Sequence, residues 1–194
     1  MPDFSIKEYV FHRAAQRRIP ISGTFEITSR CNLNCKMCYI HMTPQEQSYF
    51  GHELSAAEWI HLGRQAVKEG MIYLLLTGGE PLLRPDFCEI YRELSKMGLL
   101  ITVNTNGTLL TQEIVRCFKQ WRPEKVNITL YGMSENSYQT VCGNGQSYTA
   151  VLSAIRELKE AGINVNLNST FIRDNITDME KIIDFAKEHQ IPVR

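Results

Sequence analysis

The chain alternates strand-like and helix-like segments along most of its length. Short apolar or β-branched runs occur at residues 24–28, 72–76, 100–103, 126–130 and 163–167. Each run is followed by a segment in which apolar residues recur with helical spacing. Strands that are separated by helices pair in parallel through right-handed crossovers. We therefore predict an α/β fold whose parallel sheet either stays open or closes as a barrel.

Capping signals indicate where several of these helices begin. Ser55 and Glu58 have the spacing of a capping box, in which each side chain bonds the other's backbone N–H. Thr177 and Glu180 have the same spacing and predict a helix that extends to about His189. Further helix starts are predicted at Pro85, Thr111 and Ser147.

Two segments carry additional information about the sheet. Residues 72–76 form a continuous apolar run, which is typical of a strand buried on both faces. Residues 191–194 have the pattern of the first residues of a sixth strand. We expect residues 1–22 to be an N-terminal extension and residues 23–194 to form one core domain.

Composition favours an ordinary soluble globular protein, since 43% of the residues are hydrophobic and 22% are charged. Lys and Arg together number 21 and are balanced by 21 Asp and Glu, so there is no charge signature of binding to nucleic acid or to a membrane surface. No apolar run approaches membrane-spanning length. The absence of a signal-like opening segment and the modest number of cysteines favour a cytoplasmic location.

Cys31, Cys35 and Cys38 are spaced C-x3-C-x2-C on a loop directly after the first predicted strand. Soft thiolates are suited to iron–sulfur clusters, and these three could hold three corners of a cube. No further cysteine lies nearby in the sequence, so one iron would be open to another ligand. The loop therefore indicates a chemical site.

A zinc site is an alternative interpretation of the same loop. Structural zinc takes four ligands, and His41 could complete a set with the three cysteines. The chain would then be a non-catalytic module that uses the loop for zinc or for electron transfer. Cys88 and Cys117 fall within helical patterns and are interpreted as small buried hydrophobic residues.

Special sequences also follow the next three predicted strands. They are Thr77-Gly78-Gly79-Glu80-Pro81, Asn104-Thr105-Asn106-Gly107 and Thr129-Leu130-Tyr131-Gly132. Taken singly, each is compatible with an ordinary turn or a buried polar residue. Ligands of parallel α/β proteins bind at the carboxyl ends of the strands, where all of these sequences lie.

In this order, the Cys motif, Gly-Gly-Glu-Pro, Thr-Asn-Gly and Thr-Leu-Tyr-Gly resemble the radical S-adenosylmethionine (SAM) superfamily, from about Thr24 to Phe171. The resemblance implies a partial (β/α)6 TIM-like barrel, which this chain would follow to the start of strand six. It implies that Cys31, Cys35 and Cys38 bind a [4Fe–4S] cluster whose fourth iron chelates SAM. An electron from the cluster then cleaves SAM to a 5′-deoxyadenosyl radical, which abstracts a substrate hydrogen.

The resemblance also assigns cofactor-binding roles to individual positions. Gly78, Gly79 and Glu80 match the motif that meets the amino group of SAM, and a carboxylate suits an ammonium. Met37 matches an apolar position near the adenine. The other assigned residues are Asn106, Thr129 near the ribose, and Asn168 or Ser169 at the end of the fifth strand. No catalytic residue is assigned.

Residues 138–148 resemble a segment of the subgroup that carries a C-terminal extra-cluster (SPASM or twitch) domain. Cys142 stands where that subgroup often has an Arg or Thr close to the SAM carboxylate. The subgroup implies modification of a peptide, with synthesis of a small-molecule cofactor as the alternative. It also implies an external electron donor of flavodoxin or ferredoxin type, and an extra-cluster domain that this chain does not include.

Overall fold

A computed structural model describes residues 5–40, 42, 44–49 and 51–194. Its centre is a five-stranded sheet in the order β1-β2-β3-β4-β5, in which every neighbouring pair is parallel. The strands are β1 (Ser22–Glu26), β2 (Tyr73–Thr77), β3 (Leu100–Thr105), β4 (Lys125–Thr129) and β5 (Val165–Asn168). The predicted α/β fold with parallel strands is confirmed, and the strand ends differ from the predicted ones by no more than two residues.

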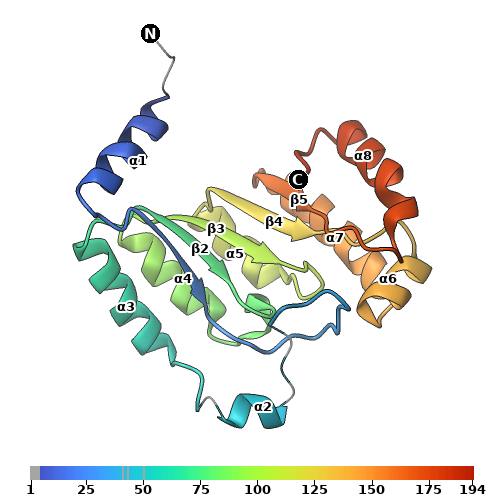
Figure 1. The fold of residues 1–194 in the computed structure, drawn as a ribbon, viewed down its shortest axis with the longest axis horizontal. Coiled ribbons are helices and arrows are strands. Elements are labelled where there is room, and N and C mark those ends of the chain that lie inside the picture. The colour runs from blue at the N-terminus through green and yellow to red at the C-terminus, as the bar shows by residue number, and fades with distance from the viewer. Residues whose placement is uncertain (1–4, 41, 43, 50) are drawn as a thin grey trace.

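Most of the helices connect the strands on the outer side of the curved sheet, whereas the first two helices lie away from that layer (Figure 1). In the described part of the chain, the helices are α1 (Ile6–Gln16), α2 (Pro44–Tyr49), α3 (Ala56–Lys68), α4 (Phe87–Lys96), α5 (Gln112–Gln120), α6 (Glu135–Cys142), α7 (Ser147–Glu160) and α8 (Met179–Glu188). Short 3-10 turns occupy Pro81–Leu83 and Ile176–Asp178. Among the described residues, no helix is both long and apolar enough to cross a membrane.

The main core lies between the outer face of the sheet and its covering helices. Leu74 and Leu76 of β2 are buried there, whereas Tyr73 and Leu75, which point to the other face, are only half-buried. The prediction that residues 72–76 are buried on both faces is therefore wrong. The core helices cover one face of β2, whereas the other face lines the hollow of an unclosed barrel and meets α1 at Tyr73.

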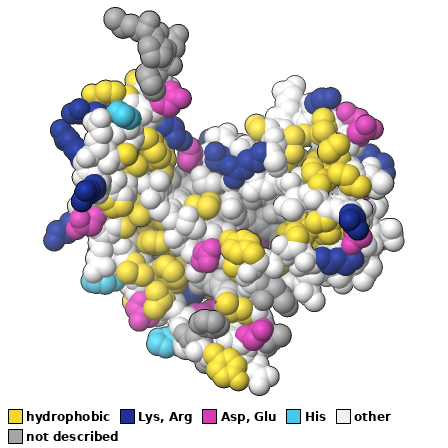
Figure 2. Space-filling model, in the orientation of Figure 1, with side chains coloured by type: hydrophobic (Ala, Val, Ile, Leu, Met, Phe, Trp, Pro, Cys, Tyr) yellow, Lys and Arg dark blue, Asp and Glu magenta, His cyan; other side chains and the backbone are white. Residues whose placement is uncertain are grey.

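The inner face of the sheet is unusually polar. Register pairs Glu26 with Thr77, and Asn127 with both Asn104 and Asn166, so polar side chains follow one another across the strands. Asn127 is buried and donates to Asn104 Oδ1 at 2.7 Å. Figure 2 shows this face hollowed between α1 and α8. A polar, incompletely filled interior is suited to holding ligands.

Helix α1 packs near the amino ends of the strands. The rings of Phe11 and Tyr73 lie 5.4 Å apart, and Lys7 Nζ lies 4.6 Å from the centre of the Tyr73 ring. Lys7 also forms an ion pair with Glu124 at 3.9 Å. These contacts attach the segment before β1 to the sheet, at the end opposite the cysteine loop.

The first predicted capping box is confirmed, and the second is wrong. Ser55 and Glu58 bond one another's backbone N–H groups at the start of α3. Thr177 lies instead inside a 3-10 turn, and α8 begins only at Met179 without a side-chain cap. Local spacing failed there because neighbouring Asp178 is engaged in tertiary contacts.

Asp178 attaches the segment before α8 to α6 and to the turn that precedes it. It is buried and accepts hydrogen bonds from Ser137 Oγ at 2.5 Å and from Met133 N at 2.9 Å. Helix α6 itself was not predicted from the sequence, because it carries few apolar residues at helical spacing.

The predicted start of a sixth strand is confirmed. Val193 forms a parallel bridge with Leu167 of β5. Leu167 N donates to Pro192 O at 2.8 Å, and Arg194 N donates to Leu167 O at 3.0 Å. The sheet therefore continues past β5 in the order that a partial barrel requires.

Candidate metal and cofactor site

Cys31, Cys35 and Cys38 line one cavity at the carboxyl ends of the strands. The cavity measures about 230 Å³, below the roughly 300–1,000 Å³ of typical ligand pockets, so these walls enclose only part of a ligand. The rest of the lining is Leu33, Met37, Tyr39, Ile40, Thr77, Gly78, Gly79, Asn104, Thr105, Asn106, Thr129, Tyr131 and Thr170. The strand-end motifs and the cysteine loop thus meet, as predicted from parallel topology.

Gly78 and Gly79 allow the backbone before Cys31 to lie directly against the end of β2. Gly79 N donates to Thr28 O at 2.7 Å, and Glu80 N donates to Arg30 O at 2.8 Å. A Cβ on Gly78 would lie 2.3 Å from Thr28 O, and one on Gly79 would lie 2.3 Å from Arg30 O. Backbone contacts within the chain therefore require glycine at both positions. The sequence alone did not indicate this requirement.

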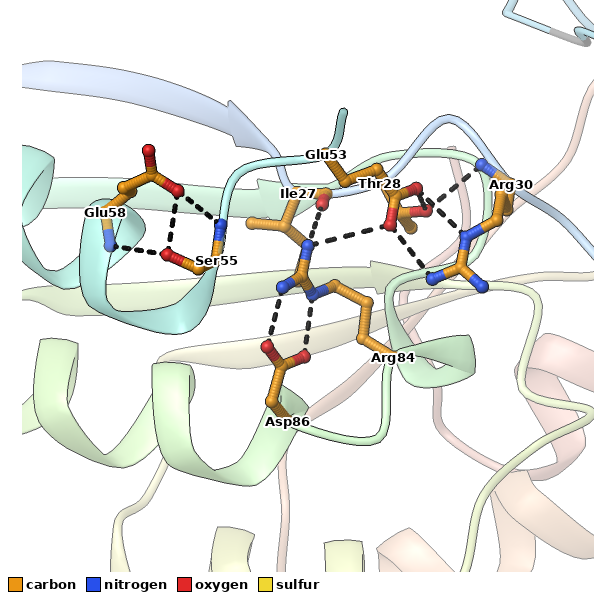
Figure 3. A network of polar contacts seen from close by, with 8 residues as sticks. All are labelled: Ile27, Thr28, Arg30, Glu53, Ser55, Glu58, Arg84 and Asp86. Atoms are coloured by element: carbon orange, nitrogen blue, oxygen red, sulfur yellow. Dashed lines mark hydrogen bonds and ion pairs between the residues drawn. The ribbon is translucent and has the colours of Figure 1, made fainter. Parts of the chain in front are cut away.

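A buried arginine holds the same segment from the side of α4 (Figure 3). The Arg84 side chain donates to Ile27 O at 2.8 Å and makes a two-pronged contact with Asp86 at 2.8 and 2.6 Å. It also lies 3.9 Å from Glu53. Such bidentate pairs fix geometry as well as adding free energy.

Glu53 completes this network at the cysteine loop (Figure 3). It accepts hydrogen bonds from Arg30 Nε and Nη2 at 3.0 and 2.9 Å, and from the hydroxyl of Thr28. Burial raises the pKa of Glu53, but bonds from Arg30 and Thr28 outweigh burial and lower that pKa. Sequence reasoning missed the network because its members lie far apart along the chain.

The Glu80 carboxylate is fully buried and faces inward. Its Oε1 accepts from Thr105 Oγ1 at 2.7 Å and from Leu82 N at 2.9 Å, while Oε2 accepts from Asn106 N at 2.7 Å. Burial nevertheless raises the pKa of Glu80 to about 7. Glu80 thus joins the turn after β2 to the turn after β3, and its contact with an ammonium group stays a prediction.

Asn106 joins the turn after β3 to the cysteine loop. Its Nδ2 donates to Asn32 Oδ1 at 3.0 Å and to Cys31 Sγ at 3.8 Å. Its Oδ1 accepts from Thr108 N at 2.9 Å and from the Thr108 hydroxyl at 2.6 Å. The predicted site residue therefore lies in the cavity and contacts one of the three cysteines.

A fourth thiol lies beside the three, although it is remote in sequence. The side chains of Cys142, at the end of α6, and of Tyr131, after β4, interact with the Cys35 sulfur. The interaction with Cys142 is the main reason that the pKa of Cys35 is lowered, to about 7. Burial instead raises the pKa of Cys31, which accepts a bond from Leu33 N at 3.4 Å.

Of the remaining residues predicted to bind the cofactor, some line the cavity and others lie outside it. Met37 and Thr129 line the cavity. Asn168 does not, and its Oδ1 accepts from Arg194 Nε at 2.9 Å. The Ser169 hydroxyl donates to Leu130 O at 2.9 Å. His41, the candidate fourth zinc ligand, lies outside the described residues.

The thiols of the cavity fit some metal groups better than others. Within the described residues, no three His, Cys, Asp or Glu side chains are grouped closely enough to bind a single ion. Sulfur ligands of an iron–sulfur cube stand farther apart than ligands around one ion. Three thiols facing one cavity therefore fit a cluster better than zinc.

Apart from its thiols, the lining that these residues provide is electrically neutral. It includes no Lys, Arg, His, Asp or Glu side chain. Within the part of the chain that the structure describes, polar contacts in the cavity come from amides, hydroxyls, thiols and backbone groups.

We expect Gly79→Ala to destabilise the fold by about 1–3 kcal/mol, since its Cβ would collide with the Arg30 backbone. Urea unfolding measures the loss. Gly23→Ala is the matched control, because its Cβ meets only the terminal methyl and the sulfur of the flexible Met71 side chain. Equal stability of the two variants would contradict the packing role of Gly79.

The buried carboxyl of Glu80 predicts a specific pH dependence. Between its unfolded pKa of about 4.3 and its folded pKa of about 7, the folded state keeps a proton that the unfolded state has lost. Stability therefore falls as pH rises through this window, by up to about 3 kcal/mol.

Urea unfolding of the wild type and of Glu80→Gln, at about pH 5 and about pH 8, isolates this contribution. The wild type should lose more stability than the variant between the two conditions. The same loss in both proteins would show that Glu80 does not titrate as its burial requires.

Comparison with known proteins gives a consistent result. The family model of the Radical SAM superfamily matches residues 25–186. An AdoMet-dependent heme synthase of Methanosarcina barkeri is 32% identical over 174 residues, 90% of this chain and 49% of the relative. An Fe-coproporphyrin III synthase of the same organism is 31% identical over 168 residues, 87% of this chain and 41% of the relative.

Solved structures show the same fold. SuiB of Streptococcus suis bound to S-adenosylmethionine has a TM-score of 0.73 and 17% identity, over 98% of this chain and 44% of that chain. The protein anSMEcpe with bound AdoMet has a TM-score of 0.73 and 18% identity, and the match covers 89% of this chain and 50% of that chain.

The chain thus spans half or less of the length of each of these proteins. The family match runs from the end of β1 through most of α8 and includes all the motifs that meet at the cavity. This chain belongs to the radical SAM superfamily.

Proposed function

We propose that this chain binds a [4Fe–4S] cluster through Cys31, Cys35 and Cys38 and binds SAM in the adjoining cavity. The observation that carries the proposal is that the three thiols and the Gly78-Gly79 backbone line the same cavity. When bound and reduced, the cluster would supply the electron that cleaves SAM and starts hydrogen abstraction from a substrate. The chain's own residues bind and orient the two groups.

The charges of the cluster and of SAM are compatible with a cavity lined by uncharged side chains. Three thiolates outweigh the positive charge of the cube, so the cluster is anionic. SAM carries an ammonium and a sulfonium against one carboxylate, so it is cationic. The two groups neutralise one another, and uncharged lining avoids the cost of burying an unpaired side-chain charge.

Residues of the lining would then hold SAM by short polar and apolar contacts. Gly78 and Gly79 expose backbone groups to the cavity, where they can meet the ammonium. The Glu80 carboxylate is fully buried behind this lining and is bonded to three internal donors. We therefore propose that Glu80 supports SAM binding by fixing this turn against Asn106.

The apolar Met37 would pack on the adenine, and the Thr129 hydroxyl would bond the ribose, since both line the cavity. Asn168 would act from the edge of the site, because its side chain is bonded to Arg194. The SAM carboxylate would be held by neutral donors. The hydroxyl of Thr170 is one candidate on this lining.

Two substrate classes are candidates. Peptide modification is the class expected from the sequence, and a structural neighbour, SuiB, is seen bound to its precursor peptide SuiA at 17% identity. A tetrapyrrole-type small molecule is the class suggested by the names of the two Methanosarcina barkeri relatives, at 32% and 31% identity. The higher identity favours the tetrapyrrole class, since the structural likeness supports the fold alone.

An external one-electron donor of flavodoxin or ferredoxin type would reduce the cluster. This requirement follows from the proposed chemistry, which consumes an electron whenever SAM is cleaved. We expect an enzyme that works in the cytoplasm, where such donors are available.

Iron binding tests the cluster ligands. Anaerobic reconstitution should give about four irons per chain, and replacing Cys31, Cys35 or Cys38 by Ala should remove most of them. Cys88→Ala is the control, because Cys88 lies on α4 outside the cavity. A colourless, zinc-containing wild type, or full iron retention in Cys35→Ala, would contradict the proposal.

SAM cleavage tests the chemistry. The reconstituted chain, given dithionite and SAM, should release 5′-deoxyadenosine, and Thr129→Val should weaken SAM binding by about threefold to thirtyfold through one lost hydrogen bond. Calorimetry measures the binding. Addition of an iron porphyrin or of a cysteine-containing peptide should increase the release of deoxyadenosine only for the correct substrate class. A loaded cluster with bound SAM and no deoxyadenosine would contradict the proposed reaction.

A further inference from the structure

The cysteine loop is attached to the end of α6 by backbone hydrogen bonds on both sides of Cys35. Asn34 N donates to Cys142 O at 3.1 Å, and Lys36 N donates to Val141 O at 3.0 Å. This short ladder fixes the position of the Cys35 backbone relative to α6. It also brings the Cys142 side chain to the cysteine loop.

Cys142 is only 1% exposed, and its thiol lies beside the Cys35 sulfur, with which it interacts. The phenol of Tyr131, which lines the same cavity as Cys35, also interacts with that sulfur. The Tyr131 ring is held edge-on to Tyr138, with centroids 6.2 Å apart. Both donors are therefore fixed by packing before any cofactor binds.

The three candidate ligands differ in their surroundings. Cys31 accepts bonds from Leu33 N and from Asn106 Nδ2. Cys35 interacts with two side chains, Cys142 and Tyr131. For Cys38, the described residues provide no hydrogen bond to the sulfur. Of the three cysteines, Cys35 is thus the one whose sulfur is influenced most by neighbouring side chains, which substitution can remove.

We propose that Cys142 and Tyr131 are positioning residues that orient the Cys35 sulfur and raise the reduction potential of the cluster. This inference rests on the proposed function, because it requires the cluster. A hydrogen bond to a thiolate ligand stabilises the more negative, reduced state, and such bonds are among the determinants of cluster potential. Position 142 commonly holds an Arg or Thr that faces SAM in the subgroup. In this chain, Cys142 at that position would act on the cluster instead.

The test is an EPR-monitored redox titration of reconstituted variants. Tyr131→Phe keeps the packed ring and removes only the donor, and Cys142→Ala removes the other donor. Each should shift the midpoint potential to more negative values, and the double variant should shift it further. Cys142→Ser keeps a donor and should shift it least. Cys117→Ala, on the outer helix α5, is the matched control and should leave the potential unchanged.

Resonance Raman spectra give a second readout that a merely structural role would not change. Loss of a hydrogen bond strengthens the Fe–S bond to Cys35, so its stretching band should move to higher frequency. An unchanged potential and unchanged bands in the loaded double variant would overturn the inference. So would loss of iron from Tyr131→Phe at unchanged melting temperature, because the donor would then be needed for cluster assembly. A wild type that takes up no iron would instead overturn the proposed function.

Discussion

The candidate site depends on one close backbone contact, where residues 28–30 lie against Gly78 and Gly79 at the end of β2. That contact fixes the position of Cys31, where the cysteine loop begins. The loop then lies at the carboxyl ends of the strands. Arg84 and Glu53 hold the contact from one side, and Glu80 joins it to the turn after β3. Side chains at either glycine would separate these backbones and move the three thiols away from the cavity.

A second feature is the division of the sheet into an apolar outer face and a polar inner face. Helices α4 and α5 bury the outer face through a cluster of aromatic rings, with Tyr91 and Phe118 centroids 5.0 Å apart. The inner face carries asparagines and threonines that a closed core would not tolerate. Stability thus comes from the outer layer, which leaves the inner layer free to serve ligands.

The sequence predicted the fold well because strand and helix periodicities are local, and it predicted the meeting of the motifs because parallel topology gathers strand ends. What it could not predict depends on long-range packing. Cys142 reaches Cys35 only through α6, a helix whose sequence pattern is weak. The burial of Glu80 depends on donors 25 and 26 residues away, and the failed cap at Thr177 depends on Asp178 and its contacts with α6.

Mössbauer spectroscopy of the chain reconstituted with isotopically enriched iron tests the central claim most directly. The account predicts a [4Fe–4S] cluster in which a single iron site changes its isomer shift when SAM is added, because only that iron lacks a cysteine ligand. A cluster whose iron sites all stay unchanged on addition of SAM, or a chain that binds no cluster, would contradict it.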